Sequence, residues 1–243
     1  KATSSGWTLQ SFGKELAFTS GSTEIAEQDT ITGLISGATA VAERIVLQSG
    51  TWAGGDAAGY LVLSGQSGTF QSEGIEVSGG GDLATIAGDS SAITLTAGGR
   101  YECMEHNFFG ASNLNRMYFV NTVDTAFEWD GTVLAPIKTG MTTDTPKHIA
   151  AHKNQLFLSF AGGSVQHSGL GAPFSWSAVT GALEIGLGQE VTGFSQDMLT
   201  ALAILGRNKI AVLYGNDSSD WVLEELRDDA GAVEWTAQRL GNL

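Results

Sequence analysis

The sequence contains very little cysteine, proline or positive charge. Its 243 residues include one Cys, three Pro and 12 Lys plus Arg, against 26 Asp plus Glu. A single Cys excludes an intrachain disulfide framework and a cysteine-rich zinc site, and we expect Cys103 to be a buried, inert thiol. The formal net charge of −14 argues against an extended binding surface for DNA or RNA, because such a surface needs Lys and Arg to neutralise phosphates.

Long apolar runs are also missing. No stretch reaches the roughly 18–20 unbroken apolar residues of a membrane helix, and residues 1–10, KATSSGWTLQ, contain no signal-peptide core. We therefore expect no membrane insertion. The acidic surface is compatible with nucleic acid that moves past without binding, as at the wall of a conduit.

Glycine is abundant and lies between short runs of β-branched and aromatic residues. The 33 Gly favour many short strands joined by tight turns and disfavour long helices. Only residues 195–209, SQDMLTALAILGRNK, have an apolar spacing that also fits a helix. We assign them to strands on the phase of a repeat. The sequence predicts an all-β fold.

The clearest unit of that fold is residues 147–176, KHIAAHKNQLFLSFAGGSVQHSGLGAPFSW. Short strands are expected from Ile149, over 156–160 and over 165–168, with turns between them. The result is an antiparallel meander. Such a meander cannot bury both faces alone, so it needs neighbours of its own kind.

A repeat of roughly 40–50 residues is typical of propeller blades, and this chain shows one. WTLQSFGKEL at 7–16 has a near copy, WTAQRLGNL, at 235–243. Equivalent turns fall at Gly13, Asn115, Lys153, Asp197 and Gly241, in steps of 102, 38, 44 and 44 residues. The structural anchors of the repeat are Trp7, Trp176, Trp221 and Trp235.

The long first step indicates an inserted domain. It exceeds a blade by about 60 residues, and residues 21–98 hold nine acidic residues but one basic residue, Arg44. We predict a partial β-propeller of about four blades, formed by residues 1–20 and 99–243, with a small inserted Gly-rich acidic β-barrel or β-sandwich at 21–98. Because the last repeat stops at Leu243, we expect the propeller to continue in a longer polypeptide.

No motif in the sequence marks a catalytic, cofactor or metal site. GxSxG, the phosphate loop and GxGxxG in a strand-to-helix context are missing. His148 and His152 would lie about 13 Å apart on a strand, so a surface or turn-supporting role is favoured over metal binding. Asp217 and Asp220 could offer oxygens to calcium, but the loop lacks the Gly and distal Glu of an EF-hand, and a hairpin turn is favoured.

Three segments resemble virion structural proteins of tailed bacteriophages, in particular propeller-built tail components of the nozzle or tail-tubular-protein-B type. They are HIAAHKNQLFLSFAGGSVQHSGLGAPFSWSA at 148–178, AVLYGNDSSDWVLEEL at 211–226 and DAGAVEWTAQRLGN at 229–242. The resemblance implies a non-enzymatic virion protein without a cofactor. It implies a ring of several copies around the DNA channel, contacts with a portal or adaptor ring and with tail fibres or spikes, and transient passage of DNA during ejection.

Two other functions stay open. A receptor-binding or glycan-degrading propeller could use carboxylates on different blades, and the candidates are Asp124, Glu128, Asp130 and Glu184. Trp129, Trp176 and Trp221 could form a sugar platform, although packing between blades is favoured for Trp at repeat-like spacing. A cellular protein-interaction propeller is the third interpretation.

Overall fold

The computed structural model describes residues 2–3, 6–7, 11–110, 114–198 and 201–237, which divide into two units. Lys1–Leu95 and Gly131–Ala135 form the first unit, and Thr96–Asp130 with Pro136–Leu243 form the second. In the described chain, helical structure is limited to the short turns η1 (Ala161–Gly163) and η2 (Ala178–Thr180). Neither has the length or hydrophobicity of a membrane-spanning helix.

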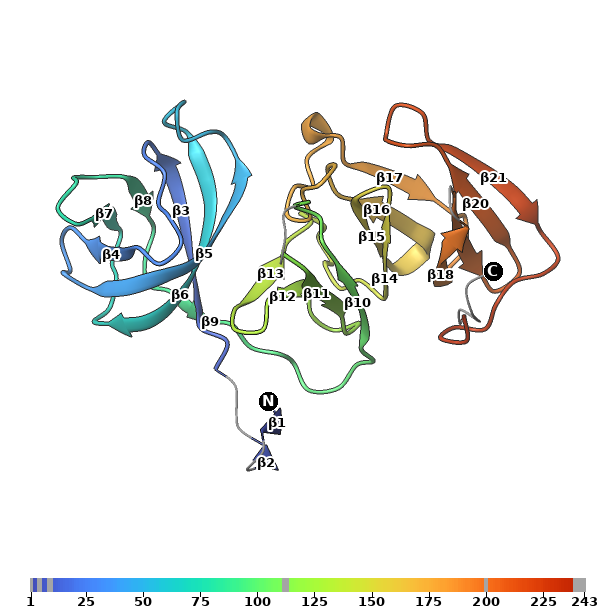
Figure 1. Cartoon of the computed structure of the whole chain (residues 1–243), viewed down its shortest axis with the longest axis horizontal. Helices are drawn as coiled ribbons and strands as arrows, with labels where there is room; N and C mark the ends of the chain where they lie inside the picture. The colour runs from blue at the N-terminus through green and yellow to red at the C-terminus, as the bar shows by residue number, and fades with distance from the viewer. Residues whose placement is uncertain (1, 4–5, 8–10, 111–113, 199–200, 238–243) are drawn as a thin grey trace. The chain divides into compact units, whose positions relative to one another are not determined.

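The first unit is a six-stranded antiparallel barrel (Figure 1). Its strands are β3 (Lys14–Gly21), β4 (Thr30–Gly33), β5 (Thr39–Ser49), β6 (Ala57–Ser67), β7 (Glu73–Val77) and β8 (Ala84–Ile86). They pair in the order β6-β5-β4-β7-β8-β3, and a further pairing of β3 with β6 closes the barrel. The short strand β9 (Ser91–Ala92) pairs with β3. A hairpin of β1 (Ala2–Thr3) and β2 (Gly6–Trp7) precedes the barrel in sequence.

Alternating side chains fill the barrel. Along β5, Ala40 and Ala42 point into the core, and after an irregularity in the pairing between Ala42 and Arg44 it is Ile45 that packs against the core. Phe18 lies in the core and its ring stacks on that of Trp52, with centroids 5.2 Å apart. Strands β5 and β6 approach closely at Gly59, where an added Cβ would lie 1.9 Å from the Val46 carbonyl oxygen. Only glycine fits at that position.

Strand β3 pairs with strands of the barrel, whereas the predicted domain boundaries placed residues 1–20 in the propeller. Leu16 lies opposite Leu61, and Phe18 lies opposite Ile86, so both apolar residues point into the barrel core. The barrel therefore begins at Lys14, and residues 16–18 are not part of a blade-like sheet. The four predicted blades reduce to three four-stranded sheets in the described chain.

The second unit contains these three antiparallel sheets, apart from Leu134 and Ala135 at the start of β13, and each sheet has its strands in chain order. Sheet one comprises β10 (Glu102–His106), β11 (Arg116–Val120), β12 (Ala126–Trp129) and β13 (Leu134–Ile137). Sheet two comprises β14 (His148–His152), β15 (Gln155–Ser159), β16 (Ser164–His167) and β17 (Leu183–Gly186). Sheet three comprises β18 (Val191–Met198), β19 (Ala201–Gly206), β20 (Ile210–Tyr214) and β21 (Val222–Arg227).

The predicted repeat is present in these sheets. Their first strands begin at Glu102, His148 and Val191, which are 46 and 43 residues apart. The predicted equivalent points match as well, since each lies where the first strand leads to the second. Asn115 directly precedes β11, Lys153 directly follows β14, and Asp197 is the penultimate residue of β18.

Segment 195–209 and the predicted turns at Gly13 and Gly241 are the remaining parts of the repeat prediction. The ambiguous segment 195–209 forms strands, as predicted, with residues 199 and 200 outside the described chain. Gly13 lies next to β3 in the barrel unit and has no counterpart in the three sheets. Gly241 lies outside the described residues.

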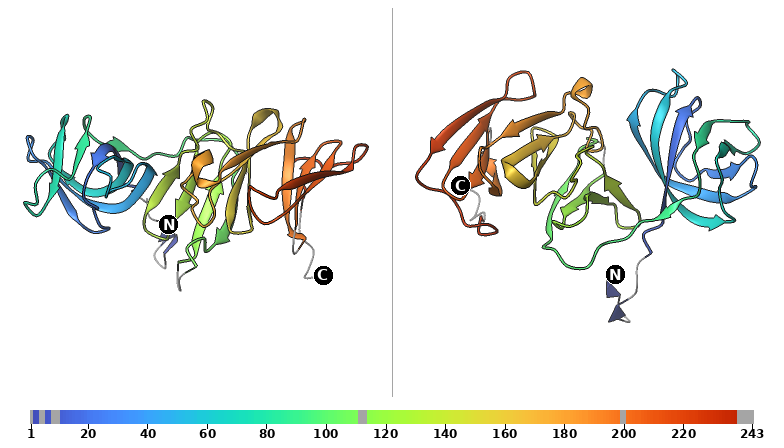
Figure 2. Two further views of the ribbon diagram at one scale, coloured as in Figure 1. Left: turned by 90° about the horizontal axis from the view of Figure 1, so that it is seen from above. Right: turned by 180° about the vertical axis from the view of Figure 1, so that it is seen from behind.

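The three sheets pack face to face and follow one another in chain order (Figure 2). Tyr118 of sheet one shares a core with Leu156 of sheet two. Phe157, on the opposite face of β15, shares a core with Leu202 of sheet three. This explains why β15 is apolar at successive positions: both of its faces are covered. Strand β10 lies against β14, and β14 lies against β18, so the first strands of the sheets are neighbours.

Candidate functional site

The two in-phase tryptophans occupy equivalent places. Trp176 and Trp221 both lie between the third and fourth strands of their sheets. Trp176 packs into the core shared by sheets one and two, and Trp221 packs into the core shared by sheets two and three. The prediction that they are structural anchors is consistent with these positions, because each covers the face that its sheet presents to the preceding one.

A buried cluster surrounds Trp221. Its indole Nε1–H donates to Nε2 of His167 over 3.1 Å, and His167 Nδ1 donates to the carbonyl of Ser168 over 3.0 Å. This pair of bonds requires the neutral imidazole with its proton on Nδ1. Burial lowers the pKa of His167, although the bond to Ser168 partly opposes that effect. The neutral form is therefore favoured by burial and by the bond that Nε2 accepts from Trp221.

His152 lies in the same cluster, with its ring 5.8 Å from that of Trp221. Burial, assisted by the charge of Lys153, lowers the pKa of His152 to about 4. Both His148 and His152 are buried, which contradicts the predicted surface role. The reason is the place of β14 between two other first strands, where both of its faces are covered.

His148 forms part of a polar site at the starting ends of the first strands. The Glu102 carboxylate accepts from His148 Nδ1 over 2.9 Å and from the backbone N–H of Ile149 over 3.0 Å, joining sheets one and two. Nε2 of His148 is buried without a hydrogen-bond partner, and the nearest carboxylate oxygen, on Glu234, lies 3.7 Å away. No sequence pattern singled out Glu102 or Glu234.

Trp235 covers this site. Its ring lies 4.4 Å from the ring of His148, and the Arg100 guanidinium lies 4.8 Å above it. Its backbone N–H donates to the carbonyl of Thr192 in sheet three over 3.3 Å. Trp235 therefore contacts residues of all three sheets or of the segment that leads into them. Trp7, its predicted equivalent, instead pairs with Ala2 in the β1–β2 hairpin.

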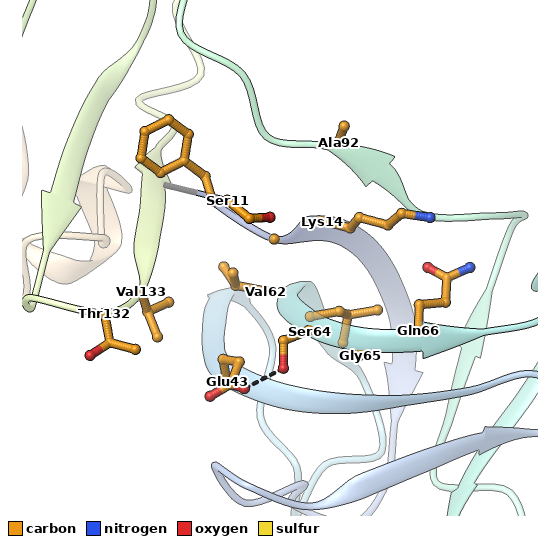
Figure 3. Close-up of a pocket in the computed structure, with 13 residues that line it drawn as sticks. Ser11, Lys14, Glu43, Val62, Ser64, Gly65, Gln66, Ala92, Thr132 and Val133 are labelled. Carbon is orange, nitrogen blue, oxygen red and sulfur yellow. Dashed lines mark hydrogen bonds between the residues drawn. The ribbon is translucent and has the colours of Figure 1, made fainter. Parts of the chain in front are cut away.

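The barrel unit carries a cavity of about 450 Å³ (Figure 3). Three of its polar lining residues form hydrogen bonds within the barrel: Ser64 donates to Glu43, and Gln66 donates to Asp89 over 2.8 Å. The lining residues include neither histidine nor cysteine. They are Ser11, Phe12, Gly13, Lys14, Glu43, Val62, Leu63, Ser64, Gly65, Gln66, Ala92, Thr132 and Val133.

The predicted calcium alternative lies in a hairpin turn. Asp220 Oδ1 accepts from the backbone N–H groups of Asn216 and Asp217, at 2.7 and 2.9 Å, and Asp217 Oδ1 accepts from Ser219. These backbone bonds lower the pKa of Asp220. Across the described residues, no three His, Cys, Asp or Glu side chains are arranged to hold a metal ion. The carboxylates cap the turn.

The candidate glycosidase carboxylates have structural partners. Glu128 is buried and accepts from the Tyr118 hydroxyl over 2.7 Å, while Asp130 pairs with Arg116 at 3.4 Å. Asp124 accepts from Thr96, and Glu184 accepts from Ser164. Asp124, Glu128 and Asp130 belong to the sheet-one part of the chain, and Glu184 lies on β17 of sheet two.

Two of the tryptophans considered for a sugar platform use their indole N–H groups in hydrogen bonds within the chain. Trp176 lines a cavity of about 210 Å³ with Gln166 and Glu184, and its Nε1–H is occupied by the carbonyl of Pro173. The indole N–H of Trp221 donates to His167.

Cys103 is exposed, not buried as predicted, because alternation along β10 places its neighbour Met104 against the core.

No protein-family model and no curated protein matches the sequence. The structure of the molecule is therefore the basis for its proposed function. Its best-organised feature is the stack of three sheets, whose first strands are neighbours and whose starting ends are joined by Glu102, His148 and Trp235.

Proposed function

We propose that this protein is a non-enzymatic structural component of a bacteriophage tail, a nozzle-like ring subunit that forms part of the DNA-ejection conduit. In this proposal the three sheets are blades of a β-propeller, and several copies assemble around the channel. Its partners are other copies, a portal or adaptor ring, and tail fibres or spikes. Its location is the virion.

The observation that carries the proposal is the mutual placement of the sheets. Meanders of four strands pack face to face, and their first strands β10, β14 and β18 are neighbours, as blades around an axis would be. The 46- and 43-residue steps between those strands support the same interpretation. The resemblance of 148–178, 211–226 and 229–242 to phage tail proteins supplies the biological setting.

The charge of the chain supports a passive role beside DNA. A protein with a formal charge of −14 has no net electrostatic attraction for phosphates. The barrel contributes to this, because Arg44, the one basic residue of 21–98, pairs with Glu27 at 2.8 Å. A duplex would therefore pass such a wall without being held.

The proposal is tested by electron microscopy of the particles and by assembly of the purified chain. An antibody against the barrel should label the tail of intact virions, and the purified chain mixed with a tail extract should be incorporated into rings. Absence of the protein from purified particles would overturn the virion role. Cleavage of a host surface polysaccharide by the purified chain, lost in Glu184→Gln, would favour the glycan-degrading alternative instead.

A further inference from the structure

The 231–237 segment, which follows β21, has few backbone hydrogen bonds to the sheets. Two backbone bonds to neighbouring strands are described: Ala232 N–H donates to Gly206 O over 2.9 Å, and Trp235 N–H donates to Thr192 O over 3.3 Å. Val233 is 62% exposed. A segment with so few buried groups and hydrogen bonds is expected to open at a lower free energy than the strands beneath it.

The backbone at Trp235 is strained. Its φ of 68° lies in the left-handed region, which bulky side chains rarely adopt. The contacts of the side chain oppose this strain, since the indole contacts both the His148 ring and the Arg100 guanidinium. Closure of the segment therefore depends on one side chain rather than on a run of backbone bonds.

The surface under Trp235 is already shaped as a site. Arg100, Glu102 and Thr192 line a cavity of about 240 Å³ beside the indole. His148 is fully buried, and its Nε2 has no hydrogen-bond partner. Removal of the indole would enlarge this cavity and expose an imidazole and a guanidinium, both of which stack on aromatic rings.

We propose that residues 231–237 form a clasp that opens and closes while the three sheets stay folded, and that the open form exposes a binding site for an aromatic side chain, formed by Arg100, Glu102 and His148. In the closed form Trp235 is the intramolecular occupant. In the open form an indole or an equivalent aromatic group from outside the segment takes its place. The inference does not depend on the proposed tail function, because it concerns contacts within the second unit alone.

The first test uses the unmodified protein. In native-state hydrogen exchange, the amide of Trp235 should exchange at least about 100-fold faster than the amides of the β14–β15 ladder, as a local opening requires. A protease that cuts after Glu should likewise cleave at Glu234 while the sheets remain protected. Exchange of Trp235 at the same rate as β14 would overturn the clasp, because opening would then require unfolding of the sheets.

The second test removes the occupant. Trp235→Gly suits the positive φ and leaves a cavity, so the variant should fold, melt at a lower temperature than the original protein, and recover at least half of that loss in millimolar indole. Val233→Ser, in the same segment, should melt within one degree or so of the original and show no response to indole. A folded Trp235→Gly protein that neither binds indole nor regains stability would refute the aromatic site. If that variant does not fold, Trp235→Phe with the exchange measurement decides the clasp.

Discussion

The hydroxyl of Ser36 donates to the buried carboxylate of Glu73 over 2.6 Å, and the backbone N–H of the same serine donates to it over 2.8 Å. The N–H groups of Ile35 and Gln71 add two more bonds. One carboxylate on β7 thus fixes the loop between β4 and β5. Burial alone would raise the pKa of Glu73, but these hydrogen bonds lower it to about 2.

Replacement of Glu73 by Gln should destabilise the barrel by about 2–3 kcal/mol, the range for hydrogen bonds to a charged group that leave donors unsatisfied. Denaturant unfolding followed at Trp52, the tryptophan of the barrel core, measures the change. Glu76→Gln is the matched control on the same strand, and it should change stability by less than about 0.5 kcal/mol. Equal effects of the two substitutions would show that the four bonds contribute nothing specific.

The same carboxylate predicts an acid transition of the barrel. Its pKa is lower in the folded state than in the unfolded chain, so its stabilising contribution is complete above about pH 4.5 and is lost as the pH falls toward 2. Glu73→Gln should remove most of this dependence. A variant that retains the full acid transition would assign it to other carboxylates.

The sheet unit should lose stability at a higher pH. The folded-state pKa values of His152 and His167 are lowered by burial, to about 4 for His152, so the unfolded chain binds more protons between about pH 6.5 and 4. Stability is complete above that window and declines as the pH falls through it. Denaturant midpoints at pH 7.5, 6 and 5 measure the slope, and His152→Gln should flatten it. A constant midpoint would contradict the buried neutral state.

The hydrogen bond from Trp221 to His167 should be measurable on its own. Trp221→Phe removes the donor and leaves Nε2 of His167 buried without one, at a cost of about 1–3 kcal/mol. A double-mutant cycle with His167→Phe separates this bond from the loss of ring volume. In the original protein, nitrogen NMR should report the Nδ1–H tautomer of His167. The opposite tautomer would show that the bond is not formed.

Close approach of β5 and β6 predicts a sharp difference between two glycines. Gly59→Ala places a Cβ 1.9 Å from the Val46 carbonyl oxygen, so the strands must separate, and we expect a loss of at least about 2 kcal/mol. Gly88→Ala meets no atom within 4 Å and should be neutral or slightly stabilising. Thermal melts of the two variants provide the comparison. Equal melting temperatures would show that β5 and β6 tolerate a wider spacing.

Local signals in the sequence account for much of the fold. The Lys153–Asn154 turn was identifiable because polar residues interrupt two apolar runs there. It is a two-residue hairpin turn, and both of its residues have positive φ. The repeat was recognisable because each sheet restarts after a similar number of residues. Alternation along β10 also carried a usable signal, since Met104 points inward and Cys103 outward.

Pairing between distant strands was not predictable in the same way. The apolar residues Leu16 and Phe18 suit any half-buried strand, and the partner that places β3 in the barrel, Leu61, lies 45 residues further along. The polar site was equally hidden. His148 became buried because neighbouring first strands cover β14, and the Glu102 and Trp235 contacts join positions 46 and 87 residues away from it.

In the proposed conduit, the position of β14 limits where a duplex could pass. Four of its five side chains are buried, and its neighbours on both sides are other first strands. In the proposed ring, the DNA channel would therefore lie between subunits and not along the axis of one sheet stack. Asp217, Asp220, Glu224 and Glu225 are exposed on the outer hairpin and last strand of sheet three, and in the proposed conduit they would repel phosphate.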